Sequence, residues 1–457
     1  MKAKKLLALL LAGAMTFSMA ACGGSNAAAT DAAPAEEAAA EEAPAEEAVE
    51  EEAPAEEEAA PAEEAVEEEA PAEEEAAPAE EAVEEEAPAE EEAAPAEEEA
   101  AAEEAPAADA AGKKVGIAMP TQSLERWNRD GSFLEAQFQA AGYETELTYS
   151  DNDIKKQVSD IENLIADNVN LLVIAAIDGE SLTQVLADAK DNNIPVLSYD
   201  RLIMNTDAIS YYVSFDNYTV GKLQGEFVVD TLGLKLDDTS KTYNIEFTAG
   251  DPADNNAGFF FNGAFDVLSP YIDAGILNVP SGQTTFEQVA TPGWDTPTAM
   301  ERMQNILGSY YGNGEVLDVA LCSNDSTALG VTQAIESDYA GDNAVIITGQ
   351  DGDEANLANI VDGKQTMTVY KAVANEAVTT LDLGVAILNG ETPDAGLIDK
   401  AGWDFDCAYD TESYDNGTGV IPSYLLVPTV VTKDNIQSEL VDTGYYTMEG
   451  DYPKAVG

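Results

Sequence analysis

The stretch Leu171-Leu-Val-Ile-Ala-Ala-Ile-Asp178 is an unbroken apolar run that ends on a carboxylate, and such continuous apolar runs are typical of parallel strands buried on both faces. Three further runs share the pattern: Pro195-Val-Leu-Ser-Tyr-Asp-Arg201, Val316-Leu-Asp-Val-Ala-Leu-Cys-Ser-Asn-Asp325 and Ala344-Val-Ile-Ile-Thr-Gly-Gln-Asp351. In open α/β sheets, ligands bind outside the carboxyl ends of the parallel strands. The polar groups that follow these four runs are therefore expected to converge on one site for a small polar ligand.

Strand-like runs alternate with helical patterns on both sides of this stretch. The first series has strands at 115–119, 145–149, 171–177, 195–199 and 211–215, and helices at 127–141, 154–167 and 182–191. The second has helices from 217 to 232, at 262–272 and at 298–307, and strands at 243–248, 286–290, 316–323 and 344–349. Two such series predict an α/β fold of two doubly wound lobes. A strand at 367–371, a helix at 372–388 and a single last strand at 424–431 would return the chain to the first lobe and back.

The first 21 residues have the pattern of a secretory signal, with Lys2, Lys4 and Lys5 ahead of an apolar stretch. The tetrapeptide Met19-Ala-Ala-Cys22 resembles a bacterial lipobox, which implies cleavage before Cys22 and lipidation of its thiol. An ordinary secretory peptide with a nearby cysteine is the alternative. We expect a protein held by a lipid on the outer face of the cell membrane.

Residues 22–112 are dominated by Ala, Glu and Pro, with a repeat that starts at Pro44, Pro61 and Pro78. Repulsion between glutamates and frequent prolines oppose helix formation, and alanine offers too little apolar surface to fold on. We interpret this segment as a disordered tether. A role in capturing cations or basic proteins is a minority alternative.

Composition excludes several classes of function. The formal net charge is −69, which repels nucleic acid. The chain has no histidine, so neither a Ser-His-Asp triad nor a histidine-ligated metal can be built. The three cysteines lack metal-ligand spacing, and no phosphate-binding glycine loop is present. We expect no metal and no cofactor. A glycosidase that uses a carboxylate pair, such as Asp178 with Asp325, stays open.

Ordered segments from 113 to 457 resemble the type I periplasmic binding proteins, and among them the multiple-monosaccharide and xylose-binding (ChvE-like) receptors of ABC importers. The segments are Gly116-Ile-Ala-Met-Pro-Thr121, Glu125-Arg-Trp127, Ile174-Ala-Ala-Ile-Asp-Gly179, Tyr199-Asp-Arg-Leu202, Phe215-Asp-Asn217, Asp254-Asn-Asn256, Phe259-Phe-Phe261, Gly349-Gln-Asp351, Tyr370-Lys371 and Pro422-Ser-Tyr-Leu-Leu426. The resemblance implies a first lobe at 113–215 with 371–428 and a second at 216–370 with 429–457. Three strands would cross between the lobes near Phe215, Tyr370 and Pro428.

The resemblance also implies which residues bind the sugar: Arg126, Trp127, Asp178, Asp200, Arg201, Asn256, Phe260, Trp294, Asp325, Gln350, Asp351 and Lys371. Gly293 stands where relatives often have an arginine before the tryptophan. Taken singly, most of these residues also fit a helix cap, a surface ion pair or ordinary core. Asp200-Arg201 and Gln350-Asp351 are the exceptions, because adjacent polar groups beyond apolar strands are costly to bury without a polar partner.

The implied function is a monomeric, lipid-anchored receptor that delivers a monosaccharide of the xylose, arabinose, galactose or glucose type to an ABC permease with a cytoplasmic ATPase. A sugar sensor for a signalling or chemotaxis partner would share the same ligand chemistry. A surface glycosidase is the third reading.

Overall fold

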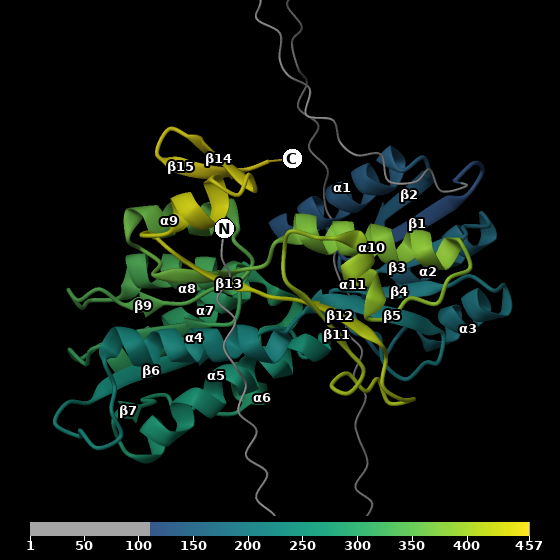
Figure 1. The fold of residues 1–457 in the computed structure, drawn as a ribbon. Coiled ribbons are helices and arrows are strands. Elements are labelled where there is room, and N and C mark those ends of the chain that lie inside the picture. Colours follow the sequence, from purple (N-terminus) through teal and green to yellow (C-terminus); the bar gives the residue numbers. More distant parts are fainter. Residues whose placement is uncertain (1–109, 457) are drawn as a thin grey trace, which may run out of the picture. The chain divides into compact units, whose positions relative to one another are not determined.

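The computed structural model describes residues 110–456 (Figure 1). The predicted signal peptide, Cys22 and almost all of the predicted tether lie outside these residues. The described part has two lobes, each built around a mainly parallel sheet with helices on both faces. Within residues 110–456, no helix is long and apolar enough to cross a membrane.

The first lobe contains a seven-stranded sheet in the order β11-β12-β5-β4-β3-β1-β2, in which only β11 runs antiparallel to its neighbour. Its strands are β1 (Lys114–Met119), β2 (Glu144–Tyr149), β3 (Leu171–Ile174), β4 (Val196–Tyr199), β5 (Ile209–Phe215), β11 (Cys407–Asp410) and β12 (Ser423–Leu426). Its helices are α1 (Glu125–Ala140), α2 (Ile154–Ala166), α3 (Thr183–Asp191), α10 (Val373–Leu388) and α11 (Gly396–Ala401).

Successive residues of these strands belong to different cores, as strand geometry requires. In β3, Val173 packs with residues of α1 and α10, whereas Leu172 and Ile174 pack with residues of α2 and α3. The unbroken apolar run is therefore buried on both faces by helices, and the polar residues that follow it lie at the edge of the sheet.

The second lobe contains a four-stranded parallel sheet in the order β7-β6-β8-β9. Its strands are β6 (Tyr243–Thr248), β7 (Leu277–Asn278), β8 (Val319–Cys322) and β9 (Ile346–Ile347). Around them lie α4 (Asn217–Leu232), α5 (Asn255–Asp273), α6 (Phe286–Val289), η1 (Pro292–Trp294), α7 (Thr296–Ile306), η2 (Leu307–Tyr311), α8 (Asp325–Asp338) and α9 (Glu354–Asp362). Residues of α4 and α5 pack on one face of the sheet, and residues of α7 and α8 on the other.

Three strand connections join the lobes. The chain leaves the first sheet after β5 and enters α4, and it returns from β10 (Met367–Tyr370) into α10. It crosses again from β12 to β13 (Thr429–Thr432), which pairs with β10 (Figure 1). The chain then forms η3 (Gln437–Val441) and the hairpin of β14 (Tyr446–Glu449) and β15 (Tyr452–Ala455), which lies beside α9 (Figure 1). The three crossings form the hinge.

Two predicted elements are wrong. The strand predicted at 286–290 is the short helix α6, because Thr285 and Gln288 form a capping box that satisfies its first backbone donors. The single strand predicted at 424–431 is two strands, β12 and β13, separated by Val427 and Pro428. Proline has no backbone N–H to continue a strand ladder, so the chain changes sheets at this point.

Candidate functional site

A cavity lies between the two lobes, at the carboxyl ends of the strands of both sheets. It is lined by Leu124, Arg126, Trp127, Asp200, Arg201, Asp254, Phe260, Trp294, Asn324, Ser326, Gln350, Asp351 and Lys371. The space between these side chains is about 350 Å³, but only about 30 Å³ of it can hold the centre of a water molecule. That smaller volume is enough for about one or two waters. The side chains thus lie so close together that most of this space is too narrow for a ligand.

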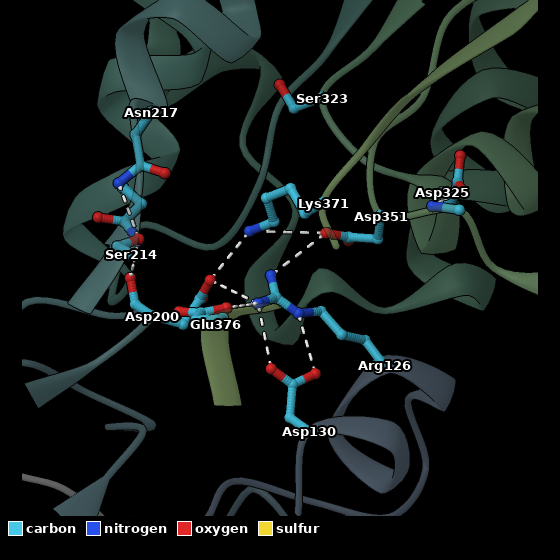
Figure 2. Close-up of polar contacts among 12 residues, drawn as sticks. Arg126, Asp130, Asp200, Ser214, Asn217, Ser323, Asp325, Asp351, Lys371 and Glu376 are labelled. Atoms are coloured by element: carbon cyan, nitrogen blue, oxygen red, sulfur yellow. Dashed lines mark hydrogen bonds and ion pairs between the residues drawn. The ribbon is translucent and has the colours of Figure 1, made fainter. Parts of the chain in front are cut away.

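Two cations and two carboxylate oxygens alternate at the centre of the cavity (Figure 2). Asp200 Oδ2 lies 2.6 Å from Arg126 Nη2 and 3.0 Å from Lys371 Nζ. Asp351 Oδ1 lies 3.2 Å from Arg126 Nη1 and 3.6 Å from Lys371 Nζ. Asp200 follows β4 of the first lobe and Asp351 follows β9 of the second. This square of charges therefore spans the cleft, and we call it the central ion square.

The backbone of Asp200 is held as firmly as its side chain. Its φ is +55°, a left-handed conformation that aspartate tolerates better than most residues. Its carbonyl oxygen accepts hydrogen bonds from Tyr212 Oη at 2.6 Å, Ser214 Oγ at 2.8 Å and Asn256 Nδ2 at 2.6 Å. Three donors on one carbonyl fix the direction of the carboxylate into the cavity, and Asn256 brings one of them from the second lobe.

Arg201 forms a second bridge between the lobes. Its Nε lies 3.1 Å from Asp254 Oδ2, and its Nη1 donates to the carbonyl of Ala176 at 3.0 Å. Trp294 Nε1 also donates to Asp254 Oδ2, at 3.3 Å. Both partners of the bridge are buried, so each charge is compensated directly by the other.

Aromatic rings form the walls of the cavity. The guanidinium carbons of Arg126 and Arg201 lie 5.0 Å and 4.9 Å from the ring centre of Trp127, within cation–π range. Phe260 packs against Trp294 with ring centres 6.2 Å apart. Trp294 also covers the backbone of Gly250, where a Cβ atom would lie only 1.9 Å from Trp294 Cη2. Glycine at 250 is therefore required for the position of this ring.

Burial and neighbouring charges shift the acids of the site in different directions. Burial alone would raise the pKa of Asp200, but Arg126 and Lys371 outweigh burial and hold this pKa below 3.8. Burial raises the pKa of Asp254, and Arg201 opposes the rise without cancelling it. Asp200 is therefore ionised at neutral pH and accepts hydrogen bonds only.

Behind Arg126, two more acids are fully buried. Asp130 accepts from Arg126 Nε at 3.2 Å and from Tyr199 Oη at 2.7 Å, and Glu376 Oε2 accepts from Arg126 Nη2 at 3.1 Å (Figure 2). Burial raises the pKa of both groups, and repulsion from Asp200 adds to the rise. These two acids hold the Nε and Nη2 groups of Arg126 on the side away from the cavity, so that Nη1 remains directed toward Asp351.

One cavity residue has an unused acceptor. Gln350 is 2% exposed, and its Oε1 accepts no hydrogen bond from the residues that the structure describes. A buried acceptor without a partner costs free energy, so a donor such as a hydroxyl group would be stabilised there.

Nine predicted site residues line the cavity: Arg126, Trp127, Asp200, Arg201, Phe260, Trp294, Gln350, Asp351 and Lys371. The other three do not. Asp178 accepts from Glu180 N at 2.8 Å and Ser181 Oγ at 2.7 Å, which places it in a local turn. Asn256 donates to the Asp200 carbonyl and does not line the cavity. Asp325 is fully buried, and its carboxylate accepts from Gly352 N, Asp353 N, Thr368 Oγ1 and Gln365 Nε2.

Asp325 therefore holds neighbouring backbone in place and does not face the cavity. Burial raises its pKa to about 7, and the nearby Asp351 adds to that rise. Asp178 and Asp325, the carboxylate pair given as an example for a glycosidase, do not line this cavity.

Four further residues line the cavity and are not among the predicted sugar-binding residues: Leu124, Asp254, Asn324 and Ser326. Asp254 and Asn324 are N-caps of α5 and α8, and each accepts a hydrogen bond from the first turn of its helix. Asn324 follows one of the four apolar runs whose polar ends were expected to converge on the site. The same rule on carboxyl ends of strands could have found Asp254, because α5 also follows a strand of the second sheet.

The cavity contains three cations, Arg126, Arg201 and Lys371, and three carboxylates, Asp200, Asp254 and Asp351. Such a balance suits a neutral ligand with many hydroxyl groups, because each hydroxyl both donates and accepts hydrogen bonds. Among residues 110–456, no cluster of acids and cysteines could hold a metal ion.

Residues 115–392 match the periplasmic binding protein domain family. The chain is 44% identical to the multiple sugar-binding periplasmic protein SbpA of Azospirillum brasilense, over 73% of this chain and 89% of that protein. It is 34% identical to the D-xylose-binding periplasmic protein of Escherichia coli, over 74% and 93% of the two chains. A solved ABC transporter solute-binding protein of Clostridium phytofermentans with bound β-D-glucose is 50% identical, with a TM-score of 0.68, covering 73% of this chain and 98% of that one.

Proposed function

Because the chain belongs to the periplasmic binding protein family, among its multiple sugar-binding and xylose-binding members, we propose that it is the extracytoplasmic substrate-binding protein of an ABC importer. It binds one monosaccharide between its lobes and delivers it to a membrane permease without converting it. The relatives named for multiple sugars and for D-xylose, and the related structure with bound glucose, support a pyranose of the xylose or glucose type.

The central ion square carries the proposal. A sugar with adjacent hydroxyl groups can donate to Asp200 and Asp351 while it accepts from Arg126 and Lys371, so each hydroxyl replaces part of an existing ion pair. Gln350 Oε1 offers a further acceptor. The apolar C–H face of the sugar would lie against the rings of Trp127, Phe260 or Trp294.

The lobes must move apart for a sugar to enter, because the space that the centre of a water molecule can reach in the cavity is only about 30 Å³. The hinge strands allow the lobes to separate, and residues of both lobes contact the ligand only when the lobes meet. A ligand that binds the closed form better than the open form shifts the protein toward closure. Closure then provides the state that the permease recognises.

We propose a first sugar-binding lobe made of residues 113–215 and 371–428, and a second made of residues 216–370 and 429–457. Lipidation at Cys22 would hold the receptor on the outer face of the membrane, and the acidic segment up to residue 112 would act as its spacer. In this proposal a monomer delivers the sugar to permease subunits with a cytoplasmic ATPase, and membership of the family supports the delivery.

A thermal-shift panel tests the proposal directly. Arabinose, xylose, galactose, glucose, ribose and fucose are each added to the protein, because a ligand that binds only the folded state raises its Tm. We expect a clear rise with at least one of these monosaccharides. A panel without any rise would contradict sugar binding.

A further inference from the structure

A second set of contacts joins the lobes on the side of α1 that does not line the cavity. Arg129 lies on α1, and its side chain is 11% exposed. Its guanidinium donates to the carbonyls of Asp351 at 3.3 Å and Gly352 at 3.1 Å, and to Asp353 Oδ1 at 3.0 Å. It also contacts the hydroxyl of Tyr446 in the C-terminal hairpin. None of these four guanidinium contacts reaches a group of the central ion square.

Glu125, one helical turn before Arg129, continues this contact. Its Oε1 accepts from the backbone N–H of Glu354 at 3.0 Å, the first residue of α9. A carboxylate at this position satisfies a free helix donor and interacts favourably with the positive end of the helix dipole. Two residues of the first lobe therefore bind one turn of the second lobe.

The turn that they bind, residues 351–354, is rigidly held within the second lobe. Asp351 and Gly352 have φ values of +104° and +77°, which set the backbone direction. Asp325 Oδ2 accepts from the N–H groups of Gly352 at 2.9 Å and Asp353 at 3.0 Å. Tyr446 Oη donates to the carbonyl of Gly352 at 2.5 Å. The turn therefore moves with the second lobe as one body.

The turn 351–354 lies between the cavity and the contacts of Arg129 and Glu125. The Asp351 side chain faces Arg126 in the central ion square, while the Asp351 carbonyl faces Arg129. These outer bonds join groups that separate when the lobes open, so they favour the closed form whether or not a ligand is present.

We propose that Glu125, Arg129, Tyr446 and the turn 351–354 form a closure latch that sets ligand affinity from outside the binding cavity. Arg129 is a positioning residue in this account, since it acts on the lobes and touches no ligand. The effect on sugar affinity rests on the proposed function, whereas the effect on lobe closure does not. Breaking the latch lowers affinity by making the closed form less populated, and it leaves the first encounter with the ligand unchanged.

The test compares the full chain with its Arg129→Ala variant. Spin labels on Asp188→Cys of α3 and Gln333→Cys of α8, in a Cys22→Ser and Cys407→Ser background, report the distance between the lobes without sugar. We expect the variant to lose short distances that the parent protein populates. We also expect the sugar to dissociate about tenfold faster or more, with little change in its association rate.

Lys364→Ala is the matched control, because Lys364 pairs with Glu336 at 2.8 Å within the second lobe alone. It should change neither the distances nor the dissociation rate. If Arg129→Ala fails to fold, Asp353→Asn removes the same charge pair from the other side. A folded latch variant with unchanged distances and unchanged dissociation would overturn the latch. Altered distances in a protein that binds none of the sugars would support the latch and overturn the proposed function.

Discussion

Asp200 Oδ2 pairs with both cations of the central ion square: it lies 2.6 Å from Arg126 Nη2 and 3.0 Å from Lys371 Nζ. One carboxylate oxygen thus connects α1 of the first lobe with the residue that follows the hinge strand β10. The two cations hold the pKa of Asp200 low despite its burial, so the carboxylate stays charged at neutral pH. Its charge is therefore available to ligand hydroxyl groups at neutral pH.

Replacing Asp200 should remove sugar binding. Asp200→Ala leaves two buried cations without their shared counter-ion and deletes the proposed hydrogen-bond partner of the sugar, so we expect affinity to fall by roughly a hundredfold or more. Calorimetric titration measures the loss, and circular dichroism checks that the fold is retained. Asp178→Ala is the control, because Asp178 lies outside the cavity. Equal affinity of the Asp200 variant and the parent protein would refute the site.

The position of Trp294 depends on Gly250. In Gly250→Ala the new methyl group would lie 1.9 Å from the indole ring, so the ring must move and the wall of the cavity with it. We expect at least about a tenfold loss of sugar affinity, measured by calorimetry. Gly258→Ala in α5 is matched to it, since nothing lies within 4 Å of its added Cβ. That control should keep its affinity and gain roughly 0.5–1 kcal/mol of stability. Unchanged affinity in Gly250→Ala would show that Trp294 does not contact the ligand.

Glu376 should make stability depend on pH. Burial and the nearby Asp200 raise its pKa well above 4.5, so the folded protein holds a proton that the unfolded chain releases. The resulting stabilisation is full below pH 4.5 and is lost as pH rises through the raised pKa. Glu376→Gln imitates the protonated acid and should flatten this decline. Unfolding free energies measured by urea titration between pH 5 and 8 provide the check. Equal slopes in the two proteins would mean that Glu376 is ionised when folded.

Lipidation is tested at Cys22, which lies outside the described residues. Cys22→Ser removes the thiol that would carry the lipid, so the variant should be released from cells that retain the parent protein. Phase separation in a mild detergent distinguishes the two forms. A variant that remains in the detergent phase would contradict a lipid anchor at this residue.

The sequence predicted the strands that carry the cavity because their cores are apolar on both faces. Leu171–Ile174 and Val196–Tyr199 are fully buried runs, and their ends place Asp200 and Arg201 in the cavity. The error at 286–290 arose because the five residues Phe286-Glu-Gln-Val-Ala290 are too few to distinguish a strand from one helical turn by periodicity, and the capping box of Thr285 and Gln288 favours the helix.

The remaining site residues depend on distant contacts that spacing does not show. Asp325 follows an apolar run just as Asp200 does, yet its carboxylate turns inward to four donors. Glu376 is an ordinary helix residue until the fold brings it against Arg126, whereas Asp130 lies one helical turn after Arg126 and could have been paired with it from the spacing. The role of Arg129 likewise depends on residues more than two hundred positions away in the chain.

The most direct test of the central claim is a calorimetric titration of the protein with D-glucose and with D-xylose. We expect heat of binding with one site per chain for at least one of these sugars, and we expect Asp200→Ala to lose this heat. The absence of binding heat for both, together with a flat thermal-shift panel, would contradict a monosaccharide site between the lobes.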